Sequence, residues 1–276
     1  MTEKYSFEEL IVTQFPRKGR GWTGGGTVAN GYFYEAGGKS AMTGKRDIQT
    51  GQIVGEVIST AIPTSIHDLS YDRFSNAMWV SPGGGLQEYW LLDMQSVPWT
   101  KIKAIPRPRY GYGIFCDRET PDVMWCADQD HNQIICMSTA TGGEFVRHVP
   151  LPFPPRGVAK VGDDFWCTQN ANPGDQGILF RVNASGDILN QFVFPPGKNT
   201  HGAGGITLDD DGYLWAVGGK NLPIYKLDIA KITGEITPDE PVTPPDDPED
   251  NTIQGVLSRL AVIEAWIEEM KIKFNL

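Results

Sequence analysis

A short aromatic motif recurs along this chain and constrains its fold more than any other feature. A Trp stands between a bulky residue and smaller ones at Ala77–Ser81, Val123–Ala127, Phe165–Thr168 and Leu214–Val217, and Tyr34 takes the Trp position in a weaker copy. The anchors at 34, 79, 125, 166 and 215 are 45, 46, 41 and 49 residues apart. This period is typical of a four-stranded propeller blade and not of a helical solenoid.

The residues around each anchor fit such a blade. The second copy shows four β-rich runs, at 66–71, 77–80, 89–93 and 99–106. A Gly follows Thr or Ser in the expected hairpin between the third and fourth strands, as at Gly51, Gly142, Gly186 and Gly234. Prolines at 63, 106, 152 and 195 end four outer strands, where a missing N–H is tolerated. We therefore expect strands throughout residues 8–234.

The fifth copy lacks a convincing outer strand. Its continuation after Gly234 is rich in Pro and acidic residues, whereas the N-terminal run Glu9–Pro16 resembles the outer strand Ile188–Pro195. We predict that the N-terminal strand completes the last blade and removes an open sheet edge. The expected fold class is all-β, a five-bladed β-propeller over residues 1–234.

The chain changes character after residue 234. Residues 235–250 hold five prolines and seven acidic residues, which predicts an extended linker. Residues 251–276 predict an amphipathic helix, with apolar residues in a heptad seam. The seam residues are Ile253, Val256, Leu260, Ile263, Ile267, Met270 and Phe274. Since β-branched residues in the seam disfavour a parallel dimer, we expect a trimer or tetramer, or docking on another protein; folding back onto the propeller is the alternative.

Composition excludes several classes of partner. The net charge of −10 and the absence of a basic run argue against nucleic-acid binding. The sequence has no apolar run long enough to cross a bilayer, and it begins without the features of a signal peptide, so we expect synthesis in a cytoplasm and no membrane partner. The four cysteines form no C-x-x-C pair, which indicates core packing and not a zinc site.

A set of polar residues precedes or begins the first strand of several units, close to one mouth of the expected central channel. The candidate ligand-binding residues are His67, Asp68, Tyr110, Tyr112, Arg156 and His201. Such a ring can hold a sugar, a carboxylate or a metal, although two histidines are too few to assign a metal. Alternatively, these side chains bond to one another and plug the channel. No catalytic motif is present, and we expect no cofactor.

The run from Asp209 to Trp215, Asp-Asp-Asp-Gly-Tyr-Leu-Trp, resembles the blade pattern of streptogramin-lyase-like and NHL-type propellers. The resemblance covers roughly residues 8–234 and implies the propeller fold. No catalytic residue of those lyases maps onto this chain. The acidic Pro-rich linker and the short heptad tail resemble the C-terminal ends of phage virion proteins.

These resemblances imply two functions. The favoured one is a non-enzymatic virion protein of the decoration, fibre or adhesin type, with the propeller carried on a self-associating or anchoring helix and binding a host-surface glycan. The alternative is a cytoplasmic lyase or hydrolase with its site at the channel mouth.

Overall fold

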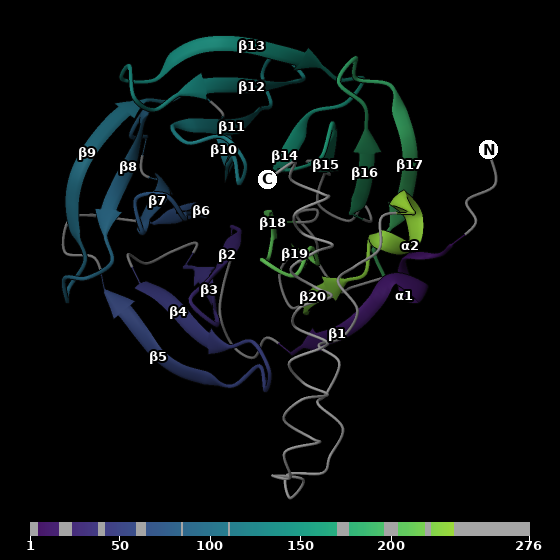
Figure 1. The fold of residues 1–276 in the computed structure, drawn as a ribbon, viewed down its shortest axis with the longest axis horizontal. Helices are drawn as coiled ribbons and strands as arrows, with labels where there is room; N and C mark the ends of the chain where they lie inside the picture. The colour runs from purple at the N-terminus through teal and green to yellow at the C-terminus, as the bar shows by residue number, and fades with distance from the viewer. Residues whose placement is uncertain are drawn as a thin grey trace, which may run out of the picture. The chain divides into compact units, whose positions relative to one another are not determined.

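The computed structural model describes residues 5–16, 24–37, 42–58, 65–83, 85–109, 111–169, 177–195, 204–218 and 222–234. The predicted linker (235–250) and C-terminal helix (251–276) lie outside these residues. The described part of the chain forms five four-stranded antiparallel sheets. Figure 1 shows them arranged as blades around a common axis. The all-β, five-bladed propeller predicted from the sequence is confirmed.

Four blades take their strands in chain order from the axis outward. They are blade 1, with β2 (Gly26–Ala29), β3 (Tyr32–Ala36), β4 (Met42–Asp47) and β5 (Ile53–Ile58); blade 2, with β6 (Ile66–Asp72), β7 (Ala77–Pro82), β8 (Glu88–Asp93) and β9 (Thr100–Pro106); blade 3, with β10 (Gly111–Cys116), β11 (Val123–Asp128), β12 (Gln133–Ser138) and β13 (Glu144–Pro150); and blade 4, with β14 (Pro155–Val161), β15 (Asp164–Gln169), β16 (Ile178–Val182) and β17 (Ile188–Val193). The inner strands β2, β6, β10, β14 and β18 contact one another in a closed ring.

Blade 5 joins the two ends of the propeller sequence. It contains β18 (Ile206–Leu208), β19 (Leu214–Val217) and β20 (Ile224–Leu227), and β1 (Ile11–Phe15) pairs with β20 as its outer strand. The predicted closure by the N-terminal strand is therefore confirmed (Figure 1).

Two details at this seam differ from the sequence prediction. The expected strand Glu9–Pro16 begins later, because α1 (Phe7–Leu10) is a helical turn with a capping box in which Ser6 and Glu9 bond each other's backbone N–H. Gly234 has a positive φ of 69°, but it ends α2 (Ala230–Thr233) and is not in a hairpin. The chain needs no hairpin there because β1 already supplies the outer strand.

The five anchor aromatics lie on the second strand of each blade and pack against the next blade. Tyr34 belongs to a core cluster with blade 2 residues, and Trp79 to one with blade 3 residues. Trp125 meets Phe165 of blade 4 edge-on at 4.7 Å, and Trp215 lies 5.5 Å from Phe33 of blade 1. Every interface between blades thus contains one anchor, which explains why the motif recurs.

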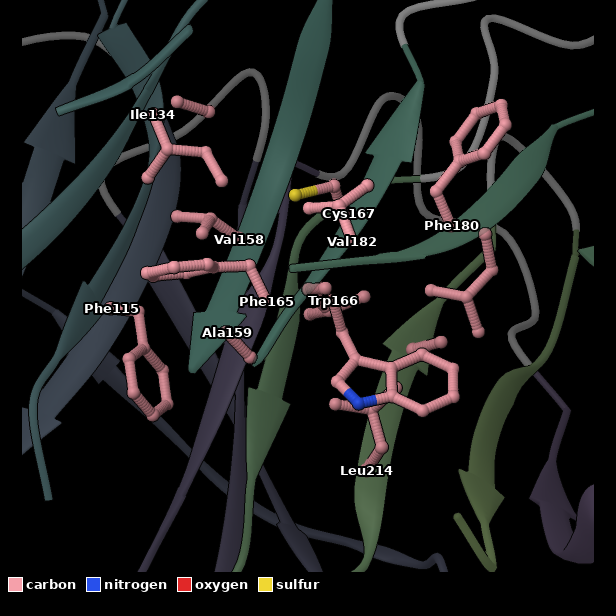
Figure 2. Packing of buried hydrophobic residues seen from close by; sticks show 14 of the residues in the cluster. Phe115, Ile134, Val158, Ala159, Phe165, Trp166, Cys167, Phe180, Val182 and Leu214 are labelled. Carbon is pink, nitrogen blue, oxygen red and sulfur yellow. The ribbon is translucent and has the colours of Figure 1, made fainter. Parts of the chain in front are cut away.

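Adjacent core residues on one strand face opposite neighbours. Figure 2 shows Phe165 directed toward Phe115 of blade 3, while the indole of Trp166 lies beside Leu214 of blade 5. This alternation follows from the two-residue period of a strand. The four cysteines are free and buried in these cores, and the predicted packing role is confirmed.

Candidate functional site

The inner strands place one acid and four glycines at equivalent positions around the axis. In each blade one residue of the inner strand pairs with the anchor: Thr27, Ser70, Phe115, Ala159 and Thr207. Two residues before this partner stand Gly25, Asp68, Gly113, Gly157 and Gly205. Blade 2 therefore supplies a carboxylic acid where the other four blades have no side chain.

The glycines are required because the inner strands approach very closely. A Cβ atom on Gly157 would lie 2.9 Å from the Cα of Gly205, and one on Gly205 would lie 2.7 Å from the Cα of Gly25. A Cβ on Gly25 would overlap the carboxylate of Asp68. The side chain of Asp68 thus occupies the space that Gly25 and Gly205 leave.

Asp68 is buried and held by the backbone. Only 2% of the residue is exposed, and its two carboxylate oxygens accept hydrogen bonds from the N–H groups of Leu69 (2.9 Å) and Ile114 (3.0 Å). Burial raises the pKa of Asp68 to about 8, and the backbone N–H groups and the charge of Arg156 oppose this rise. Asp68 therefore joins blades 2 and 3 at the axis.

Three consecutive inner strands carry a β-bulge at the mouth, the end of the axis where these strands begin. The register shifts between Ile66 and Asp68, between Gly111 and Ile114, and between Pro155 and Gly157. The residues within these shifts include His67, Tyr112 and Arg156. A bulge redirects the side chain of its extra residue, so the backbone presents these three side chains at one end of the propeller.

These residues and Arg107 form what we call the mouth cluster: His67, Arg107, Tyr112 and Arg156. The rings of His67 and Tyr112 have centroids 4.4 Å apart, and the guanidinium carbon of Arg107 is 5.5 Å from the Tyr112 ring. Burial, and then the charges of Arg107 and Arg156, lower the pKa of His67 to about 4. At neutral pH the imidazole is uncharged and lies in a positive field.

Arg107 follows β9 and is fixed by neutral acceptors. One terminal nitrogen, Nη1, donates to Ser81 Oγ (3.1 Å) and to the carbonyl of Pro82 (2.6 Å), and Nη2 donates to the carbonyl of Leu86. The residue is 7% exposed, and its buried Nε has no partner among the described residues. Sequence reasoning missed Arg107, because it lies between strands and outside the blade register.

The opposite end of the axis is closed by different groups. Arg118 of blade 3 donates to the carbonyl of Leu208 and to the carboxylate of Asp210, both in or next to blade 5. Blades 3 and 5 are not neighbours, so this contact crosses the end of the axis. Between this end and Asp68, the hydroxyls of Thr27 and Thr207 lie 3.2 Å apart. The mouth cluster is therefore at one end of an axis lined with bonded polar groups.

The structure brings together three of the predicted site residues at the mouth, namely His67, Tyr112 and Arg156. Asp68 lies one residue further along the strand than His67, and its carboxylate accepts hydrogen bonds from backbone N–H groups inside the axis. Tyr110 and His201 lie outside the described residues. The ligand site and the plug both stay predictions, and the hydrogen bonds of Asp68 given above go to the backbone N–H groups of Leu69 and Ile114.

The described part of the chain shows neither a reactive thiol nor a metal-binding group. Burial raises the pKa of the Cys126 thiol to about 12 and also raises those of Cys116 and Cys167, which makes them poor nucleophiles. No three His, Cys, Asp or Glu residues of the described ranges gather in a way that would hold a metal ion. Within those ranges, no helix has the length and apolar character to span a membrane.

Comparisons with known proteins extend only to the fold. No protein-family model matches the sequence, and no curated protein matches it. Glutaminyl cyclase from Myxococcus xanthus is 11% identical, with a TM-score of 0.58 over 79% of this chain and 94% of that chain. A streptogramin B lyase structure is 16% identical, with a TM-score of 0.50 over 78% of this chain and 96% of that chain. The resemblance to lyase-type propellers is thus confirmed for the fold, and the fold alone leaves the activity open.

Proposed function

We propose that the protein is a non-enzymatic phage virion protein of the decoration, fibre or adhesin type, and that its propeller binds a host-surface glycan at the mouth cluster. The observation that carries the binding role is the repetition of the bulge. In three consecutive blades the inner strand departs from regular pairing where it presents His67, Tyr112 and Arg156. Regular pairing would suffice for a ring that only had to close.

The chemistry of the mouth cluster suits a sugar. Aromatic rings such as those of Tyr112 and His67 offer flat apolar faces, and guanidinium groups offer several hydrogen-bond donors for hydroxyls or acidic groups. Binding sites combine such surfaces with a few fixed polar groups. Arg107 is held by three hydrogen bonds before any ligand arrives, so its position costs little entropy on binding.

The virion setting rests on the C-terminal sequence. An acidic Pro-rich linker at 235–250 and the heptad segment at 251–276 suit a propeller displayed on a helix that self-associates or anchors to another virion protein. Display in three or four copies would multiply a weak single-site affinity.

The glycan role is tested by probing an array of neutral and acidic glycans with the labelled full-length protein. We expect selective binding that Tyr112→Ala abolishes. Phe74→Ala is the matched control, because Phe74 is an exposed aromatic in the turn between β6 and β7 of blade 2, and it should leave binding unchanged. An array without any bound glycan contradicts this role.

The assembly role is tested by light scattering on the full chain and on a chain ending at Gly234. We expect a trimer or tetramer that becomes a monomer on truncation. A full-length monomer would leave the helix docked on the propeller or reserved for another protein, and would count against self-association.

The alternative is a lyase or hydrolase acting at the same mouth. The observation in its favour is that the His67 and Tyr112 rings lie 4.4 Å apart at the mouth, where an uncharged imidazole has a ring nitrogen that can accept a hydrogen bond from a substrate. An enzyme should lose turnover in His67→Ala and His201→Ala, whereas a binding protein should keep its fold and assembly in both.

A further inference from the structure

The mouth cluster holds two guanidinium groups in a partly or largely buried place. Burial lowers the pKa of both Arg107 and Arg156. Asp68 acts on Arg156, whereas among the described residues no carboxylate acts on Arg107. The positive charge of Arg107 is therefore unbalanced within the described part of the chain.

The hydrogen bonds of Arg107 do not supply this missing negative charge. Its three hydrogen bonds go to a hydroxyl and two carbonyls, all neutral, and its buried Nε remains without an acceptor in the described structure. Burying a charge that is neither paired nor fully bonded is unfavourable, and each such group in a folded protein calls for an explanation. The protein as a whole has a net charge of −10, so the positive mouth runs against its overall composition.

We propose that the mouth cluster binds an acidic saccharide, whose carboxylate or sulfate group is held by Arg107 and Arg156 while the sugar ring lies against Tyr112. This inference rests on the proposed glycan role and specifies its ligand class. Tyr112 interacts electrostatically with both guanidinium groups, and its ring centroid lies 5.5 Å from the guanidinium carbon of Arg107. The anion supplies the counter-charge that Arg107 lacks among the described residues.

The uncharged state of His67 fits this arrangement. The two arginines already disfavour a third positive charge at the imidazole, so His67 contributes a ring face and a neutral hydrogen-bonding group to the ligand. The long-range field of the arginines would also attract an anion, and salt would weaken that attraction.

The test uses the full-length protein and pairs of glycans that differ only in the acidic group. Sialylated glycans are compared with their desialylated forms, uronate-containing glycans with the neutral sugars, and sulfated glycans with the unsulfated ones. We expect at least one acidic member to bind about 30-fold or more tightly than its neutral partner, and added salt to weaken it. The three arms show whether the anion is a carboxylate or a sulfate.

Two substitutions each remove one positive charge, one at the mouth and the other at the opposite end of the axis. Arg156→Gln should reduce the affinity for the acidic glycan about 30-fold or more. Arg73→Gln is the control, because Arg73 is half exposed and pairs with Asp210 at 3.8 Å at the far end. It should leave the affinity unchanged. A thermal melt of each variant confirms that it is folded, and Arg107→Lys provides a second, charge-preserving probe of the guanidinium geometry.

The outcomes separate this inference from the proposed function. Binding of neutral glycans alone, or equal affinity for both members of every pair, would overturn the acidic ligand and leave the glycan role standing. Equal losses in Arg156→Gln and Arg73→Gln would show a general charge effect and also overturn it. Failure of every glycan to bind would remove both proposals.

Discussion

The carboxylate of Asp68 occupies the space that a side chain on Gly205 would need, since a Cβ atom there would lie 2.6 Å from Asp68 Oδ1. One acid from blade 2 and the glycines of the other blades therefore form a single interlocked set at the axis. The contact between Asp68 and Gly205 joins blades 2 and 5, which are not neighbours in the ring.

Gly205→Ala should destabilise the propeller by about 1–3 kcal/mol, because the added methyl group meets the Gly25 backbone as well as Asp68. Gly55→Ala is the matched control, since no atom lies within 4 Å of a Cβ built there. It should change the free energy of unfolding by at most about 1 kcal/mol, toward greater stability. Urea unfolding of the two variants measures both effects, and equal values would contradict the packing at the axis.

Asp68 should make stability fall as the pH rises. Burial raises its pKa from 3.8 to about 8, so the folded protein keeps a proton that the unfolded chain loses above about pH 4. This contribution is complete below pH 4 and is lost progressively up to about pH 8. The Asp68→Asn variant lacks this contribution to stability. In addition, its side-chain NH2 group would face one of the two backbone N–H donors. The stability gap between wild type and variant should therefore narrow from pH 5 to pH 8.5, and a constant gap would refute the raised pKa.

His67 should act in the opposite direction. Its pKa is lowered from 6.5 to about 4, so the folded protein resists a proton that the unfolded chain takes up below about pH 6.5. Stability from this group is present above pH 6.5 and is lost as the pH falls toward 4. The His67→Gln variant should not show this loss of stability between pH 6.5 and pH 4. His131→Gln is an informative comparison, because Asp128 raises the pKa of His131. Protonation of His131 in acid therefore stabilises the folded protein, whereas protonation of His67 destabilises it. The two variants should diverge from wild type in opposite senses in acid unfolding series.

Two buried tryptophans should respond differently to the same substitution. Trp215 Nε1 donates to Asp209 Oδ2 at 2.7 Å, whereas Trp166 Nε1 is buried without a partner among the described residues. Both Trp→Phe changes leave a similar cavity, but only Trp215→Phe also removes a hydrogen bond to the buried Asp209 carboxylate, whose Oδ1 keeps the backbone N–H groups of Asp211 and Tyr213. It should cost about 1–3 kcal/mol more than Trp166→Phe. A larger loss for Trp166→Phe in urea unfolding would contradict this.

The sequence predicts the blades well because each anchor serves the same purpose, the packing of one blade on the next. The equivalence of Asp68 with the axial glycines of the other blades could not be predicted from the sequence, because the turn between the first two strands of a blade varies in length. Asp68 precedes its anchor Trp79 by 11 residues, whereas Gly157 precedes Trp166 by 9. Their equivalence emerges only from cross-strand pairing.

Two further features depended on information outside the strand pattern. The capping box of Ser6 and Glu9 was present in the sequence and predicts the helical turn that shortens the first strand. Arg107 had no comparable pattern, because its role comes from carbonyls of Pro82 and Leu86 that tertiary structure brings to it. The seam residues from Ile253 to Phe274 stay a prediction.

The pairing of β1 with β20 has a consequence for how the chain is made. Ile11 leaves the ribosome long before its partner Leu227 exists, so β1 must wait while the first four blades form. Contacts between such distant residues carry a large loop-closure cost and are expected to form late. Until then the nascent protein is an open arc with an unsatisfied strand at each end. Its passage from synthesis to a closed ring is the stage at which a second copy can most easily supply the missing strand.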